Sequence, residues 1–121
     1  MSSLHVELLW WKGCPSTERA LALVSDALDD AGFGATAVNM VEVVSDQQAV
    51  ELAFRGSPTI RIGGVDLVSL AGGDDPAAGE PAALTCRLYR CRDGRISPTP
   101  DPADVAAAIH VAIAATAAVV G

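Results

Sequence analysis

The sequence contains few aromatic residues, few basic residues and few cysteines. Only 4% of its 121 residues are Phe, Trp or Tyr, although half are hydrophobic. The core must therefore be built mostly from small and aliphatic side chains, each of which buries little area. Eight Lys and Arg residues stand against fifteen Asp and Glu residues, for a net charge of -7. This balance argues against nucleic acid as a partner, because such binding depends on clustered cations.

The start of the chain also lacks the marks of an export signal. Residues 1–5 carry no positive flank and no long apolar run, so we expect a cytoplasmic protein with no membrane partner. In that reducing compartment the three cysteines, Cys14, Cys86 and Cys91, are thiols. An odd count does not suggest a structural disulfide framework. The length is that of one domain, residues 1–121.

Hydrophobic periodicity predicts an α/β alternation of strands and helices. Pro15 and Pro102 suit first helical positions, and Ser45 with Gln48 forms a capping box. The expected strands are 5–11, 35–44, 59–62 and 65–68, and the expected helices are 15–31, 45–54 and 102–120. A loop over 69–81 and a short extra strand over 84–90 belong to an insertion at about 69–98. The predicted order is βαβαββα, with this inserted loop before the last helix.

Two junction segments make this order resemble the thioredoxin fold. They are Trp11-Lys12-Gly13-Cys14-Pro15, between the first strand and helix, and Gly56-Ser57-Pro58-Thr59, before the third strand. The chain is similar to small bacterial thioredoxin-like proteins that carry Gly-Cys-Pro, Phe-Arg-Gly-Ser-Pro-Thr and Cys-Arg-Leu-Tyr-Arg segments. Some of those proteins are labelled alkylmercury lyase. The resemblance covers the chain to about Ala114.

The resemblance implies that Pro58 is cis, that it lies against Cys14, and that the Ser57 backbone pairs with an extended substrate. We assign substrate binding to Trp11, Pro15, Ser57 and Pro58. The alternative for Pro58 is a plain X–Pro turn that ends the second helix. Arg55 is a candidate anchor for an acidic thiol cofactor, or simply a solvated cation at a helix end.

Cys14 is the predicted catalytic nucleophile. A thiol at a helix N-cap faces unpaired N–H groups and the positive end of the helix dipole, and both favour the thiolate. Lys12 adds positive charge, whereas Trp10 and Trp11 could desolvate the thiolate and raise its pKa. We expect a lowered pKa. The alternative is that Cys14 is a small buried hydrophobic residue.

A dithiol thioredoxin has a second cysteine where this chain has Thr17, so exchange within one helical turn is impossible. We expect monothiol chemistry, in which Cys14 forms a mixed disulfide or sulfenic acid that another thiol resolves. Cys86 is the preferred resolving thiol, with a low-molecular-weight thiol as an external reductant, and Cys91 is incidental. Thr17 either donates a hydrogen bond at the sulfur or caps a backbone N–H. The cysteine spacing predicts no metal site.

Three functions remain open on this sequence. The first is a monothiol thiol–disulfide oxidoreductase or thiol peroxidase acting on a small-molecule or protein thiol or disulfide. The second is soft-metal or organomercurial handling by Cys14 with Cys86, for which only Asp74 and Asp75 are candidate acids. The third is a non-redox binding or tailoring protein that keeps the fold. His5 and His110 are expected to be structural or exposed.

The last predicted helix is almost wholly apolar over 105–120. It is shorter than the roughly 20 residues that a membrane-spanning helix needs. A helix that is apolar all round must be covered on more than one face, so we expect a homodimer through it. The alternative is that its alanines are tolerated in water.

Overall fold

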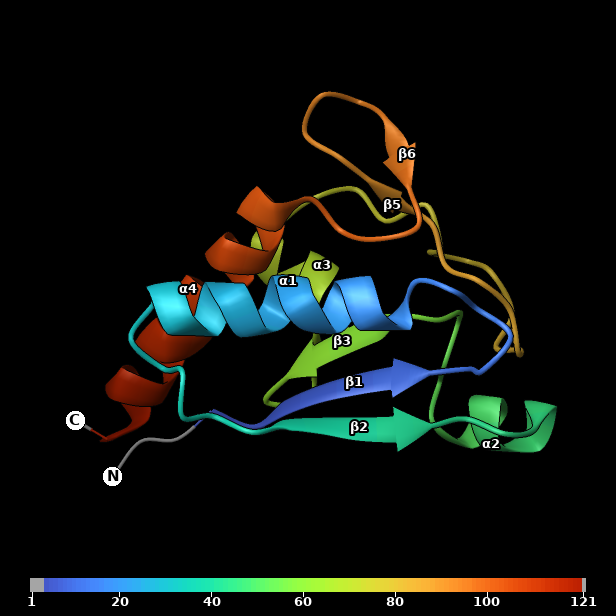
Figure 1. The fold of residues 1–121 in the computed structure, drawn as a ribbon, viewed down its shortest axis with the longest axis horizontal. Helices are drawn as coiled ribbons and strands as arrows, with labels where there is room; N and C mark the ends of the chain where they lie inside the picture. Colours follow the sequence, from blue (N-terminus) through green and yellow to red (C-terminus); the bar gives the residue numbers. More distant parts are fainter. Residues whose placement is uncertain (1–3, 121) are drawn as a thin grey trace.

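The computed structural model describes residues 4–120, with side chains described through residue 115. It is a mixed α/β structure built on a four-stranded sheet of order β2-β1-β3-β4 (Figure 1). The elements are, in chain order, β1 (Val6–Trp10), α1 (Thr17–Asp30), β2 (Val38–Glu42), α2 (Asp46–Glu51), β3 (Thr59–Ile62), β4 (Val65–Asp66), α3 (Leu67–Ala71), β5 (Tyr89–Arg90), β6 (Ile96–Ser97) and α4 (Pro102–Val120).

The central strand β1 is parallel to one neighbour and antiparallel to the other. It pairs with β2 in parallel, with Val6 opposite Val38, and with β3 in antiparallel, with Leu8 opposite Ile60. Parallel pairing follows from α1, because a crossover helix returns the chain to the same end of the sheet. β3 then turns at Gly63 and Gly64, both at positive φ, into β4. The predicted hairpin at Gly63-Gly64 is confirmed.

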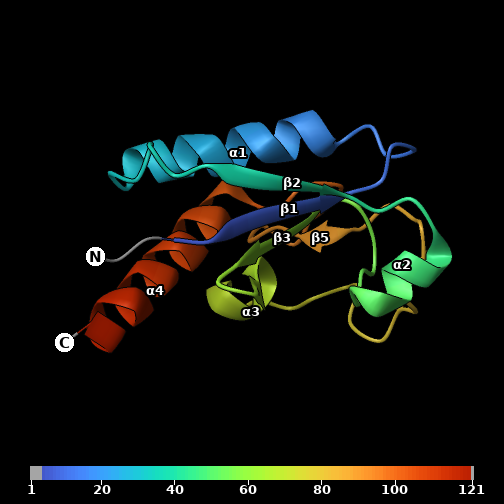
Figure 2. The same ribbon diagram turned by 90° about the horizontal axis from the view of Figure 1, so that it is seen from below.

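The sheet is covered on both faces. One core cluster joins residues such as Leu8 and Ile60 to Val24 of α1 and Ile109 of α4, and all four are buried. A smaller cluster of Leu9, Val43, Ala49 and Phe54 packs α2 on the opposite face. Figure 2 shows α1 and α2 on opposite sides of β1 and β2. Because successive strand residues point to opposite faces, Leu8 and Leu9 contribute to different clusters.

The predicted strand over 65–68 is wrong in its second half. β4 ends at Asp66, whose carboxylate accepts a hydrogen bond from Val68 N–H at 2.9 Å and so caps α3. α3 thus takes the second half of the predicted strand, where it buries Leu67 and Val68, and the start of the loop predicted over 69–81, and its C-cap is Gly72 in the left-handed region. An N-cap aspartate and a C-terminal glycine are ordinary helix boundaries, but here they enclose only five residues.

Two helix boundaries also differ from expectation. α1 begins at Thr17, and its N-cap is Ser16, so Pro15 precedes the cap and does not hold the first helical position. α2 ends at Glu51 rather than at Phe54, because Ala53 adopts a positive φ of 53°. At the last helix the prediction is correct. Pro102 is its first residue, and the Asp101 carboxylate accepts a hydrogen bond from Ala103 N–H at 2.9 Å.

The chain between α3 and α4 crosses the end of the sheet where β1 and β2 finish (Figure 1). Of the strand predicted over 84–90, only Tyr89 and Arg90 belong to a ladder, and they pair with β6 rather than with the main sheet. Cys86 instead makes an isolated parallel bridge to Ser57. Among the described residues, no helix is long and apolar enough to cross a membrane.

Candidate functional site

Three segments far apart in the sequence meet at the backbone of Ser57. The Trp11 N–H donates to Ser57 Oγ at 3.0 Å, and the Ser57 N–H donates to the Thr85 carbonyl at 2.8 Å. The Ser57 carbonyl accepts the Arg87 N–H at 2.8 Å. Ser57 is fully buried, so these contacts satisfy its polar groups away from water. Ser57 therefore joins the loop after β1 to residues 85–87.

Cys14 is held at the same point. Its thiol donates to the Ser57 carbonyl oxygen at 3.2 Å, and its N–H donates to the Trp11 carbonyl at 3.0 Å. The side chain is 5% exposed. The Ser57–Pro58 peptide bond is cis. Cys14 is not the N-cap, because two residues separate it from the first helical residue, Thr17.

Cys86 lies next to Cys14, which the sequence alone could not establish. The pKa of the Cys86 thiol is raised, first by desolvation, then by a hydrogen bond with the Cys14 side chain and by its charge. Both thiols are free, Cys14 buried and Cys86 exposed. Both cysteines converge on Ser57, because the Cys14 thiol donates to its carbonyl oxygen and Cys86 forms a parallel bridge with it. Two free thiols are therefore held beside one backbone position.

Arg87 anchors the segment that carries Cys86. Its guanidinium, 3% exposed, donates to both carboxylate oxygens of Asp66, at 2.7 and 3.0 Å, and to Asp75 Oδ2 at 3.1 Å. The same group lies 4.6 Å from the centroid of the Tyr89 ring. The Tyr89 hydroxyl in turn donates to the Pro58 carbonyl. The segment is thus tied to β4, to the loop after α3 and to the Ser57–Pro58 turn.

Gly56 makes this close approach possible. Its φ is +135°, a conformation that side-chain-bearing residues rarely adopt. A β-carbon added there would lie 2.8 Å from the Arg87 Cα, which is shorter than any ordinary contact. Residues 85–87 therefore pack directly on the Gly56 backbone.

The other predicted site residues near Cys14 in the sequence are Trp11, Pro15 and Thr17. The Trp11 ring lies over Gly13, closely enough that a β-carbon there would overlap it. Pro15 is exposed and does not contribute to a ladder. Thr17 Oγ1 is buried and has no hydrogen-bond partner, so the hydroxyl does not cap a backbone N–H in this structure.

Other candidates lie apart from the thiol pair. The Cys91 thiol is buried, with the Arg95 Nη2 at 3.9 Å. His5 is paired loosely with Glu7 at 3.8 Å, and His110 is exposed. Asp75 is bonded to Arg87. In the part of the chain that the structure describes, no cluster of three or more His, Cys, Asp or Glu side chains could hold a metal ion.

A pocket of about 260 Å³ opens beside Cys86. Its lining combines apolar side chains with three charged ones, and comprises Arg55, Pro76, Ala77, Glu80, Pro81, Ala83, Thr85, Cys86, Arg87 and Leu88. The lining therefore contains Arg55, which the sequence proposed as an anchor.

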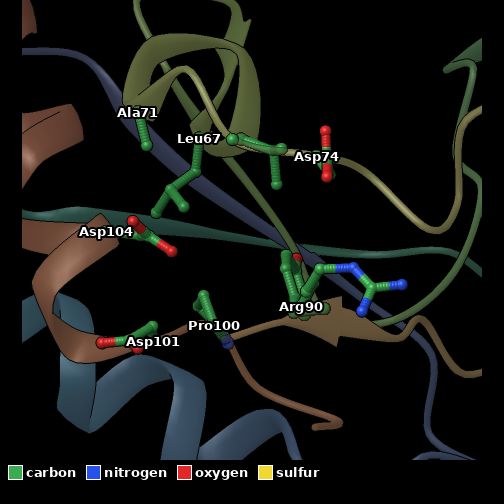
Figure 3. A pocket seen from close by; sticks show the side chains of 10 residues that line it. Leu67, Ala71, Asp74, Arg90, Pro100, Asp101 and Asp104 are labelled. Atoms are coloured by element: carbon green, nitrogen blue, oxygen red, sulfur yellow. The ribbon is translucent and has the colours of Figure 1, made fainter. Parts of the chain in front are cut away.

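A second pocket lies between α3 and the start of α4, away from the thiols. Asp74, Asp101 and Asp104 surround it together with Arg90 (Figure 3). Its volume is about 20 Å³, which holds a water molecule but no substrate. Asp74, a candidate acid for carbon–mercury cleavage, thus lines a cavity that contains neither Cys14 nor Cys86.

The sequence did not single out Gly56, Asp66 or the buried role of Arg87. The structure buries Arg87, Tyr89 and Cys91 and exposes the residues between them, as in a strand, but the residue types do not alternate in the same way because Leu88 is exposed. A charged residue on the buried side requires a partner, but only the fold brings Asp66 to it. The chain matches no family model, no curated protein and no solved structure.

Proposed function

We propose that this protein is a thioredoxin-like thiol–disulfide oxidoreductase in which Cys14 and Cys86 alternate between dithiol and disulfide. The observation that carries the proposal is the convergence of both cysteines on Ser57, since the Cys14 thiol donates to its carbonyl oxygen at 3.2 Å and Cys86 forms a parallel bridge with it. Element order supports the fold assignment: a βαβ unit followed by an antiparallel hairpin, with the cysteine after β1 and the cis proline before β3.

The reaction proceeds in two displacements. The Cys14 thiolate attacks one sulfur of an external disulfide, forming a mixed disulfide and releasing a thiolate that takes up a proton. The Cys86 sulfur, on losing its proton, then attacks Cys14 Sγ, and the second external thiol leaves. Two external thiols and one Cys14–Cys86 disulfide result, so two electrons pass from protein to substrate. With hydrogen peroxide as oxidant, Cys14 forms a sulfenic acid and Cys86 expels water.

Cys86 therefore replaces the cysteine that is missing at Thr17. It approaches Cys14 from a distant segment rather than from the same helical turn, so the nucleophile and the resolving thiol belong to one chain. A low-molecular-weight thiol would return the disulfide to the dithiol. We place this cycle in the cytoplasm, with no resident cofactor, and in a homodimer formed through α4.

The test is oxidation of the reduced protein with one equivalent of peroxide or hydroxyethyl disulfide, followed by peptide mass spectrometry without reduction. A peptide pair linked through Cys14 and Cys86 is expected. Cys14→Ser and Cys86→Ser should each abolish it, whereas the matched control Cys91→Ala should form it at the unchanged rate. Linkage only between separate molecules, or none at all, would overturn the proposal.

A second candidate function rests on the same contact. Two adjacent thiolates suit a two-coordinate soft ion. Binding of such an ion would need both cysteines but no oxidant, and the bound protein would retain no free thiol at either position. Organomercurial cleavage would require an acid as well, and the Asp75 carboxylate is already bonded to Arg87.

A further inference from the structure

The position that an extended polypeptide would occupy beside Ser57 is filled by the chain itself. Extended partners bind a strand edge through its backbone N–H and C=O groups. At Ser57 both groups are already used, by Thr85 and Arg87 at 2.8 Å each, and the residue is fully buried. Cys86 lies between these two residues. The chain thus presents its own cysteine to Cys14 as a bound substrate peptide would.

Residues 85–87 are held in this position by ion pairs and close packing. Arg87 is held by Asp66 and Asp75, and its backbone packs on Gly56. A competing polypeptide would have to break the buried ion pair before it could reach Ser57. Such a pair is costly to separate, because each charge would be left without its partner.

What remains open is the pocket of about 260 Å³ beside Cys86. That volume is slightly below the usual range for ligand sites, so the pocket suits only a compact molecule. Arg55 and Glu80 line it from different segments, and both are exposed. Among the described residues neither side chain has a hydrogen-bonding or ion-pair partner. One unpaired cation and one unpaired anion border the same thiol.

We infer that the substrate is a small zwitterionic disulfide of the amino-acid type, with its carboxylate on Arg55 and its ammonium group on Glu80. The inference rests on the proposed function. One thiol of the pair takes one half of the disulfide and releases the other half as a thiol. The second thiol of the pair then displaces the bound half, so that one disulfide is reduced to two amino-acid thiols while the protein is oxidised to the Cys14–Cys86 form.

The experiment follows formation of the Cys14–Cys86 disulfide by rapid alkylation and mass spectrometry. The oxidants are L-cystine, cystamine, dithiodipropionate, hydroxyethyl disulfide and the oxidised dimer of an unstructured decapeptide with a central cysteine. Each is tested on the wild type, Arg55→Gln and Glu80→Gln. Arg95→Gln and Glu51→Gln are matched controls, because neither residue lines this pocket. Ratios between variants for one oxidant cancel its intrinsic reactivity.

Arg55→Gln should lower the rate of disulfide formation with L-cystine and with dithiodipropionate by roughly threefold each, as expected for a partly solvated charge contact. The rate with cystamine, which has no carboxylate, should not fall. Glu80→Gln should slow L-cystine and cystamine by a similar factor and leave dithiodipropionate no slower. Hydroxyethyl disulfide should not respond to either substitution. The peptide dimer should react at least roughly tenfold more slowly than L-cystine, since it cannot form backbone hydrogen bonds at Ser57.

Two failures are distinguishable. If the Cys14–Cys86 disulfide forms but the peptide dimer is as fast as L-cystine, or neither charge substitution changes the rate ratios, the substrate class is wrong and the proposed function stands. If no oxidant produces the disulfide, both are overturned.

Discussion

Arg87 lies against Asp66 with two parallel hydrogen bonds, Nη1 to Oδ2 at 2.7 Å and Nη2 to Oδ1 at 3.0 Å. This planar pairing joins the segment that carries Cys86 to the end of β4, where the same carboxylate also caps α3. Bidentate pairs are stronger and more directional than single ionic contacts. One carboxylate therefore positions both a helix and the resolving thiol.

Removal of this guanidinium should destabilise the protein severely. Arg87→Met leaves Asp66 and Asp75 without their partner in a mostly buried setting, and we expect a loss of about 3 kcal/mol in the free energy of unfolding. Urea titration at neutral pH measures it. Arg92→Met is the control, because Arg92 is more than half exposed in its pair with Asp104 and should lose no more than about 1 kcal/mol. Equal losses in the two variants would show that Arg87 is not an anchor.

Gly56→Ala should displace the same segment, residues 85–87, which packs on the Gly56 backbone. The new methyl group would require an unfavourable φ and would overlap the Arg87 backbone, so we expect a loss of about 3 kcal/mol. It should also slow formation of the Cys14–Cys86 disulfide, because residues 85–87 must move.

Gly63→Ala separates the effect of an unfavourable φ from the effect of overlap with the Arg87 backbone. Gly63 also has a positive φ, of 61°, but a β-carbon there meets open space. That variant should lose only about 1 kcal/mol and should oxidise at the wild-type rate. Similar oxidation rates in the Gly56 and Gly63 variants would contradict the packing argument.

The main elements were predictable because their signals are local. The apolar period of α1, the Ser45 cap of α2 and the Asp101-Pro102 start of α4 each lie within a few residues of the element they define. By contrast α3 was missed, since a helix of five residues has too little periodicity to separate it from a strand or loop.

The candidate site was predictable only in part, because only some of its contacts have local sequence signals. Cys14 and Ser57 were identified from their junction segments, and both lie at the site. The neighbour of Cys14 depends on where a long loop returns, and loop closure leaves no local pattern. Nor could sequence show that Thr85 and Arg87 would use the Ser57 backbone groups, because that pairing spans distant segments.

Thr17→Val tests whether the unpaired hydroxyl serves the reaction. Because Thr17 Oγ1 is buried with no partner, its removal should leave stability unchanged or raise it by up to about 1 kcal/mol. If the hydroxyl donates to the reactant, the second-order rate of Cys14 oxidation by peroxide should fall about tenfold. Thr17→Ser keeps the hydroxyl and should retain most of the rate. An unchanged rate in Thr17→Val would assign the residue to packing alone.

Tyr89 should make stability depend on pH in the alkaline range. Burial raises its pKa above the ordinary value near 10, so the folded protein keeps a proton that the unfolded chain loses. This contribution is fully present below about pH 10 and is lost as the pH rises further, by up to about 1.4 kcal/mol per pH unit. Since Tyr89 is the single tyrosine, tyrosinate absorbance follows it directly.

Tyr89→Phe provides the comparison for that titration. The variant loses the hydrogen bond to the Pro58 carbonyl, which should cost about 1 kcal/mol at neutral pH. Its stability should then decline less steeply than that of the wild type above about pH 10. Parallel pH profiles would place the tyrosine hydroxyl in solvent.

The thiol pair itself makes a prediction about alkylation. Because desolvation, the hydrogen bond with Cys14 and its charge all raise the pKa of Cys86, its rate of reaction with iodoacetamide should rise with pH only above the range of a free thiol. In Cys14→Ser the charge is absent, so the inflection for Cys86 should move to lower pH while remaining raised by burial. Cys91→Ala should leave it unchanged. Peptide mass spectrometry resolves the two sites. If the inflection for Cys86 lies at the same pH in Cys14→Ser as in the wild type, the two thiols do not interact.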